Sequence, residues 1–349
     1  MAYTTIDDPS EYFHTRLYSG NGSTQSITNN ANAGNFQPDW VWFKRRTGSN
    51  SHQLYDSVRG ATKRIRSDTN EAESTVSAGL TSFDSNGFSL GSDEAVNVNS
   101  GSFVAWQWKA NGGTTTSGGS DDTVSTSAHQ ANTTAGFSVV TYSGTGTQGH
   151  TVAHGLGVAP EVIFLKARNK SQNWRVFHHK TASDGTKRLI LDQTNAQEDA
   201  AFLNDTAPSS TVFTLGASDD AWNASDGTYV AYCFAPIQGY SKFGSYTGNN
   251  STDGVFIYTG FKPAWLMVKK TDGTANWDIT TAAISQNQID ERLRANLSNA
   301  EESSGYVDFL SNGFKMRNTN GSQNNGSYIY MAFAEHPFVS SKGVPVTAR

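Results

Sequence analysis

The sequence predicts an all-β protein made of three tandem antiparallel β-sandwich units of a jelly-roll or lectin-like kind. Three observations predict it: the composition, short bursts of apolar residues, and an internal repeat. Only 16% of the 349 residues are charged, and the polar residues are mostly Asn, Ser, Thr and Gly. These four residue types favour turns and strand-flanking loops. An up-and-down barrel is the alternative architecture.

Apolar residues arrive in short runs bounded by Gly, Pro or Asn, which is typical of strands. The clearest runs are WVWF at 40–43, FVAW at 103–106, VIFL at 162–165 and YIYM at 328–331. Because these runs are continuous and do not alternate with polar residues, they indicate strands that are buried on both faces. Helical periodicity is nearly absent.

The chain resembles itself three times. The segment PDWVWFK at 38–44 returns as PEVIFLK at 160–166 and as PAWLMVK at 263–269. A glycine turn precedes each copy, and a glycine-led aromatic strand closes each unit at 101–106, 227–232 and 326–331. Blocks that recur in one order indicate a duplicated fold of about 100 residues, a size that can hold its own core.

The repeats divide the chain into six parts. We expect an N-terminal attachment segment at 1–11, repeat 1 at 12–110, a Gly/Ser/Thr linker at 111–134, repeat 2 at 135–238, repeat 3 at 239–338 and a C-terminal tail at 339–349. Only PIQG at 236–239 separates repeats 2 and 3, so these two should abut rigidly, with repeat 1 freer behind its flexible linker. Residues 289–297 look helical by propensity, but their counterparts predict a strand from Arg292 to Ala295.

Charge and motifs exclude several function classes. With 26 basic and 31 acidic residues the net charge is −5, so no positive field gathers nucleic acid. Cys233 is the single cysteine, which excludes an intrachain disulfide framework. No apolar run is long enough for membrane insertion, and the N-terminal residues do not look like a secretion signal. Motifs of serine hydrolases, P-loop proteins and zinc proteases are missing, so we expect no enzyme activity.

One loop of repeat 2 is the first candidate for ligand contact. Trp222 could offer an aromatic plate to a sugar ring, and Asn223 and Asp226 could bind its hydroxyl groups. Asp219 and Asp220 in the same loop are the candidate metal ligands, since clustered carboxylates suit Ca²⁺. We expect no other cofactor. A solvated loop, with Trp222 packed inward, is the alternative for all five residues.

Four further features have structural interpretations that we favour. His150 and His154 lie in a glycine-rich turn, where His154 should hydrogen-bond its own turn rather than hold zinc. His178 and His179 end a strand, with one ring facing in and one out. The basic clusters at 44–46 and 63–66 suit a protected strand edge. Cys233 is expected to be a small buried strand residue without chemistry.

Two segments carry a family resemblance. HGLGVAPEVIFLKAR at 154–168 resembles a turn-and-strand segment of bacteriophage tail-fibre and virion structural proteins. TTIDDPSEYF at 4–13, with the YSGNG turn after it, resembles the start of repeat-containing marine-phage proteins. The resemblance implies concanavalin-like sandwich modules, a place on the tail or capsid surface of the virion, and other virion proteins as partners. No site residue is implied, and repeats 1 and 3 lack the HGLG turn.

Three functions follow as hypotheses. The first is a tail-fibre or receptor-binding appendage, a rigid rod of three units that binds a host-surface glycan or protein without catalysis. We expect a homo-oligomer in this case, for instance a trimer, because weak contacts add up through multivalency. The second is a capsid decoration or tail adaptor that contacts only virion proteins. The third is a polysaccharide depolymerase, which needs two carboxylates about 5–10 Å apart.

Overall fold

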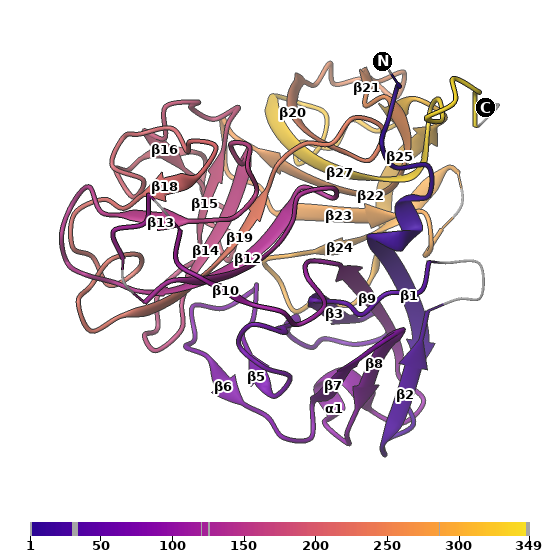
Figure 1. Ribbon diagram of the computed structural model, residues 1–349. Helices are drawn as coiled ribbons and strands as arrows, with labels where there is room; N and C mark the ends of the chain where they lie inside the picture. The colour runs from indigo at the N-terminus through magenta and orange to yellow at the C-terminus, as the bar shows by residue number, and fades with distance from the viewer. Residues whose placement is uncertain (1, 30–33, 120, 125, 286, 347–349) are drawn as a thin grey trace.

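The computed structural model describes residues 2–29, 34–119, 121–124, 126–285 and 287–346. Almost all regular structure in these ranges is β, with one short α-helix and one 3-10 helix, which confirms the predicted all-β class. Three groups of strands surround a common centre, and both chain ends lie beside the third group (Figure 1).

The elements up to residue 110 begin with a 3-10 turn in the expected N-terminal segment, and the N-cap of this turn is Asp8. They are η1 (Pro9–Glu11), β1 (Phe13–Ser19), β2 (Gln25–Thr28), β3 (Trp40–Arg45), β4 (Gln53–Asp56), β5 (Lys63–Arg64), β6 (Ser74–Thr75), β7 (Leu80–Asp84), β8 (Gly87–Leu90), α1 (Glu94–Asn97) and β9 (Ser102–Trp108).

The elements of repeat 2 include two strands that precede its expected start. They are β10 (Thr116–Ser117), β11 (Ala128–Asn132), β12 (Phe137–Ser143), β13 (Thr151–Ala153), β14 (Val162–Ala167), β15 (Arg175–His178), β16 (Lys187–Arg188), β17 (Glu198–Asp199), β18 (Val212–Thr214) and β19 (Thr228–Phe234).

The strands of repeat 3 form one sheet that folds back on itself, since residues from its two ends share one hydrophobic cluster. They are β20 (Ser241–Thr247), β21 (Phe256–Tyr258), β22 (Phe261–Lys270), β23 (Trp277–Thr281), β24 (Ile289–Arg294), β25 (Glu302–Leu310), β26 (Gly313–Met316) and β27 (Ser327–Pro337).

One strand order recurs in each repeat. Four neighbouring strands run β1-β9-β3-β4, β12-β19-β14-β15 and β20-β27-β22-β23, and we call each set the inner sheet. A second pairing recurs as β2–β8, β13–β18 and β21–β26 on the outer side. The three proline-led segments therefore form the same inner strand, β3, β14 or β22, in every repeat.

Each inner sheet is buried on both faces, which explains the continuous apolar runs. Successive side chains of a strand point to opposite faces. In β3, Trp40 and Trp42 point into a cluster common to all repeats, whereas Val41 and Phe43 join a cluster of repeat 1 alone. The corresponding strands β14 and β22 divide their side chains in the same way.

The shared cluster, here called the central core, joins the three repeats at their inner faces. The rings of Trp40 and Tyr232 stack across repeats 1 and 2 with centroids 4.4 Å apart. The ring of Phe333 in repeat 3 packs edge-on against two rings, with its centroid 5.7 Å from that of Trp108 in repeat 1 and 5.9 Å from that of Phe234 in repeat 2. The expected rod, with repeat 1 freer than the others, is therefore wrong, because the apolar inner faces are buried against one another.

The segment 111–134 is not a free linker. Its strand β11 pairs with β12 through five residue pairs and extends the inner sheet of repeat 2 by one strand. Asp39 accepts hydrogen bonds from the backbone of Ala110, Gly112 and Gly113, which fixes the start of the segment. The strand predicted from Arg292 lies in β24, so tertiary pairing overrides the local helical propensity there.

Candidate functional site

The interfaces between repeats, here called seams, use corresponding residues. Trp174 of repeat 2 donates its indole N–H to the Arg66 carbonyl of repeat 1 at 2.8 Å. Trp277 of repeat 3 donates in the same way to the Ile190 carbonyl of repeat 2 at 2.9 Å. His52 takes this position at the third seam, with Nε2 lying 2.9 Å from the Arg294 carbonyl. The seams thus close a ring, and features common to all of them are architectural.

His52 fits because its ring is held neutral. The indole N–H of Trp42 donates to its Nδ1 at 2.7 Å, so the ring proton lies on Nε2 and is donated to Arg294. Burial lowers the pKa of His52 well below the usual value, which keeps this tautomer free of a second proton. At this seam Trp42 and His52 together make the link to a carbonyl of the neighbouring repeat, which a single tryptophan makes at each of the other two seams.

Three buried lysines also occupy corresponding positions. Lys44, Lys166 and Lys269 end the proline-led segments, and burial lowers the pKa of each from 10.5 to about 8. Lys166 donates to the Asn70 carbonyl of repeat 1 at 2.9 Å, and Lys269 to the Thr194 carbonyl of repeat 2 at 3.1 Å. Lys44 donates to the Arg45 carbonyl within its own repeat. Two of the three lysines, Lys166 and Lys269, thus hold a loop of the neighbouring repeat at a seam.

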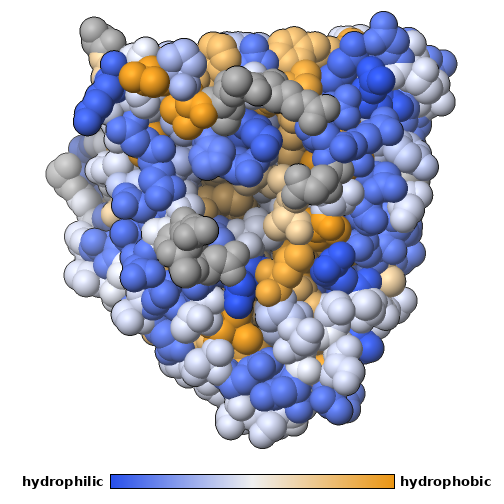
Figure 2. Space-filling view, turned by 90° about the vertical axis from the view of Figure 1, so that its right-hand side faces the viewer, coloured by the Kyte–Doolittle hydropathy of each residue, from blue (hydrophilic) through white to orange (hydrophobic). Residues whose placement is uncertain are grey.

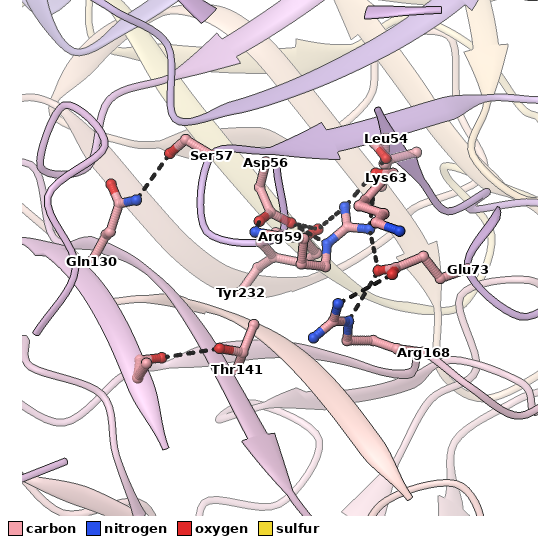
Figure 3. Close-up of polar contacts among 11 residues, drawn as sticks. Leu54, Asp56, Ser57, Arg59, Lys63, Glu73, Gln130, Thr141, Arg168 and Tyr232 are labelled. Atoms are coloured by element: carbon pink, nitrogen blue, oxygen red, sulfur yellow. Dashed lines mark hydrogen bonds and ion pairs between the residues drawn. The ribbon is translucent and has the colours of Figure 1, made fainter. Parts of the chain in front are cut away.

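A charged network is specific to the seam between repeats 1 and 2 (Figure 3). Arg59 is fully buried against Asp56, and it also donates to Glu73 at 3.0 Å and to the Tyr232 hydroxyl at 3.2 Å. Tyr232 in turn donates to Asp56 at 2.7 Å, and Arg168 pairs with Glu73. Every charged group of the network has an oppositely charged partner, in the other repeat or in its own. The network therefore holds the two repeats together and leaves no charged group free to bind a ligand.

In the predicted contact loop, most features recur in all three repeats and support the fold, and one side chain is specific to repeat 2. Asn223 is fully buried; it accepts from the Thr145 backbone and donates to the Thr147 and Gly216 carbonyls. Asn97 and Asn324 make the same bonds in repeats 1 and 3. Asn223 is therefore an internal clamp, and the expectation that it contacts a ligand is wrong.

Trp222 is half-buried, and its position is occupied by Val96 in repeat 1 and Gln323 in repeat 3. The backbone carbonyl is architectural, because a tyrosine hydroxyl binds it in every repeat: Tyr18, Tyr142 and Tyr246. The indole ring is specific to repeat 2, with the guanidinium groups of Arg175 and Arg188 centred 5.6 and 5.8 Å from it. Only this ring of the predicted loop stays a candidate for contact.

The acidic residues of the loop are already engaged. Asp219 accepts from the Ala221 backbone, and Lys170 pairs with both Asp220 and Asp226 at 2.6 and 2.5 Å. The Lys170 ammonium thus lies between the carboxylates that a calcium ion would need. Within the described ranges no group of three or more His, Cys, Asp or Glu side chains could hold a metal ion. The calcium expectation has no support from these positions.

His154, His178 and His179 are explained by hydrogen bonding. His154 accepts from the Leu156 backbone at 3.2 Å within its own turn, as the sequence predicted. Burial lowers the pKa of His178 to about 3, and its Nε2 lies 3.2 Å from the Tyr330 carbonyl of repeat 3. His179 is partly exposed and approaches the Phe243 carbonyl of repeat 3 at 3.0 Å. Both His178 and His179 therefore belong to a seam.

The basic clusters and the cysteine have structural roles too. Arg46 pairs with Glu301 across a seam at 2.7 Å, and Arg66 pairs with Glu71. Arg64 lies 3.6 Å from Asp93. Cys233 is buried in β19, and burial raises the pKa of its thiol, so it is unreactive there.

Sequence reasoning missed the seam residues, although a signal was present. The lysine that ends each proline-led segment and the Asn-Trp pairs at 173–174 and 276–277 recur at fixed offsets. Recurrence of a polar residue within an apolar strand could have indicated an internal contact. The partner carbonyls lie about 75 to 110 residues away, and no pattern along the chain marks them.

A family model described as a domain of unknown function, DUF7483, matches residues 8–337. The chain belongs to this family. The DUF7483 match extends from η1 to the end of β27, so one domain model spans all three repeats together with the central core. No curated protein and no solved structure matches the chain. None of the helices in the described ranges has the length and apolar character needed to cross a bilayer.

Proposed function

We propose that this protein is a structural component of a bacteriophage particle, an appendage on the tail or capsid surface that binds the host surface without catalysis. Two things support the proposal: the phage-like segments at 4–13 and 154–168, and the construction of the molecule. Binding proteins commonly present variable loops on a rigid scaffold. Here the closed ring of seams is the scaffold, and the repeat-specific residues lie on it.

The observation that carries the proposal is the difference between shared and unshared residues. The clamps, seams and core residues recur in the three repeats, and so does Arg188, which corresponds to Arg64 and Arg292. The Trp222 ring and the guanidinium of Arg175 beside it occur in repeat 2 alone. A partly exposed indole ring with two guanidinium groups near it is suited to contact with a glycan or protein surface. Many copies on one particle would raise weak contacts to useful avidity.

An adaptor that contacts only other virion proteins is the second candidate. One observation favours it: three equivalent sheets around one centre make a pseudo-threefold body, which suits a partner assembly of threefold or sixfold symmetry. In this case the three domains expected from the sequence, at 12–110, 135–238 and 239–338, are parts of one body packed around the central core.

The test is to label the purified full-length protein and measure its binding to host cells, and to locate its density in a reconstruction of the whole particle. We expect saturable binding that Trp222→Ala weakens, with Val158→Ala, at another exposed apolar residue, as the matched control. Density at an exposed tip supports the host-binding role. Density enclosed by tail subunits, together with no cell binding, would establish the adaptor instead.

A further inference from the structure

The three seams differ beside the edge strand that one repeat presents to the repeat before it in the ring. This edge strand is β12, β20 or β1, the first strand of each inner sheet. Two corresponding positions of the preceding repeat lie beside it: the second residue of the proline-led segment, and the residue that follows β4, β15 or β23. They are Asp39 and Ser57 at the first seam, Glu161 and His179 at the second, and Ala264 and Ala282 at the third.

At the first seam the chain fills this place with a strand of its own. β11 pairs with the free edge of β12, and Gln130 lies opposite Val139. The Gln130 amide donates to the Ser57 hydroxyl and accepts from the Gly113 backbone, both at 3.1 Å. Asp39 binds the backbone at the start of the same segment. An added strand is therefore part of this seam.

At the second seam side chains close the place instead. Nε2 of His179 lies 3.0 Å from the Phe243 carbonyl on the edge of β20, and 3.2 Å from the Glu161 carboxylate. The edge of β20 thus contacts the preceding repeat directly at this point, without an added strand.

At the third seam the place is open. Both corresponding residues are alanines, and a groove of about 280 Å³ lies between them and Thr15, the residue of β1 that corresponds to Val139 and Phe243. Its walls come from η1, β1, the residues after β23, and β27, and we call it the edge groove. On this side of the molecule apolar side chains gather in a hollow between polar rims (Figure 2).

The backbone of β1 is unpaired along this groove. Tyr12 and Gly20, at the two ends of β1, direct their backbone bonds toward β9 and its neighbours. Because this direction alternates along an antiparallel strand, Thr15 and Leu17 direct their N–H and C=O groups to the opposite side. Among the described residues no strand lies on that side of β1, and neither backbone has a hydrogen-bond partner there. An unpaired edge of this kind is a template for another strand.

We propose that the edge groove binds an extended strand of a partner protein, which pairs with β1 as β11 pairs with β12. Extended segments bind sheet edges in this way, with backbone hydrogen bonds for affinity and alternate side chains for specificity. The partner residue opposite Thr15 takes the position that Gln130 has at the first seam. It meets two alanine methyl groups in place of two polar side chains, so the residue that fits there is apolar.

A single extended segment fits the groove better than the edge of a second copy. η1 and the residues after β23 wall the groove beside β1. The β1 strand of a second copy would bring its own η1 and its own repeat 3 to the same place. The inference goes beyond the proposed host-binding function and does not rest on it, because the groove and the contact ring of Trp222 lie in different repeats.

The experiment is fluorescence anisotropy with the full-length protein and dye-labelled peptides that copy β11. The first peptide has the sequence of residues 126–134 with Gln130→Leu, and the second keeps Gln130. The leucine peptide should bind saturably. The glutamine peptide should bind about 10-fold more weakly, because its amide is buried without the partners that it has at the first seam. A third peptide, with His129→Leu instead, directs the leucine to the opposite face and should bind no better than the second.

Two variants of the protein test the place of binding. Ala282→His copies the residue of the second seam, so it should fill the groove and abolish binding of the leucine peptide. Thr15→Pro removes an N–H that the fold does not use and should have the same effect. Ala207→His, the same exchange as the first variant but at an exposed alanine of repeat 2, is the matched control and should bind like the wild type. Circular dichroism checks that each variant is folded.

No saturable binding of the leucine peptide to the wild-type protein, or undiminished binding to folded Ala282→His, would overturn the proposal. Sedimentation that shows a wild-type dimer which Ala282→His separates would also overturn it, because a second copy would then occupy the groove. Peptide binding by a protein that does not coat host cells supports the edge groove and refutes host binding alone.

Discussion

At the residue scale, polar groups are buried at corresponding positions of the three repeats. Lys44, Lys166 and Lys269 are charged groups at corresponding buried positions, and each is satisfied mainly by carbonyl oxygens. Burial of a charge is unfavourable unless hydrogen bonds compensate for it. Lys166 and Lys269 therefore fix where loops of the neighbouring repeat lie, at a cost in stability that depends on pH.

Lys166→Met should change how stability depends on pH. The pKa of Lys166 is about 8 in the folded protein, against 10.5 for the free side chain. Between these values the unfolded chain binds more protons, so the free energy of unfolding rises with pH; this lysine contributes on the order of 1–2 kcal/mol between about pH 7.5 and 9.5. Urea unfolding at the two pH values measures the rise.

The Met variant should lack the part of the rise that Lys166 supplies, whereas Lys180→Met, at an exposed lysine, should keep the wild-type rise. Equal rises in all three proteins would show that Lys166 has an ordinary pKa.

Arg59→Met should destabilise the protein strongly. It leaves Asp56 buried without its cation and takes a donor from Tyr232, and breaking a buried ion pair in this way costs about 3–5 kcal/mol. Replacing both partners, as Asp56→Leu with Arg59→Met, should cost less than the single change because no lone charge remains. Chemical denaturation of the three proteins tests this; a double variant worse than the single one would contradict it.

At the scale of elements, each loop between the outer strand and the closing strand is held by one asparagine. Asn97, Asn223 and Asn324 place one side chain where it satisfies backbone groups from two loops. An amide can do this because it donates and accepts at once. The loop that looked like a ligand-binding loop in the sequence is thus built the same way in all repeats.

Asn223→Ala should lower the free energy of unfolding by about 2–4 kcal/mol, because several buried backbone groups lose their partner. Asp226→Ala, at a side chain that is 76% exposed, should leave it nearly unchanged. Thermal and urea unfolding measure both. If Asn223 were a solvent-facing ligand residue, its loss would leave stability unchanged.

At the scale of the whole molecule, the repeats are joined into one body. Each repeat has its own outer cluster, but the inner face of each sheet is buried only when the other two are present. A single repeat would expose large aromatic side chains such as Trp40, Trp174 or Trp265. The stability of the protein therefore depends more on the packing between the three repeats than on the packing within any one of them.

The full chain should unfold in a single cooperative transition, and a fragment of residues 135–238 should not fold alone. Calorimetry and tryptophan fluorescence on the full chain should give coincident midpoints. The fragment should lack dispersed NMR signals, because its inner sheet faces water. Separate transitions, or a well-folded fragment, would indicate three independent domains.

The sequence by itself determined the all-β class, the repeat and the strand at Arg292, because strand runs and glycine turns are local signals. It also determined that the runs are buried on both faces, since polar residues do not alternate within them.

Only the tertiary structure decided how the repeats meet. An apolar run such as 40–43 does not say whether its second face packs on its own partner sheet or on a neighbouring repeat, because burial has no direction along a sequence. For the same reason Asn223 and Trp222, adjacent in the chain, could not be told apart as clamp and surface ring until the loops around them had positions.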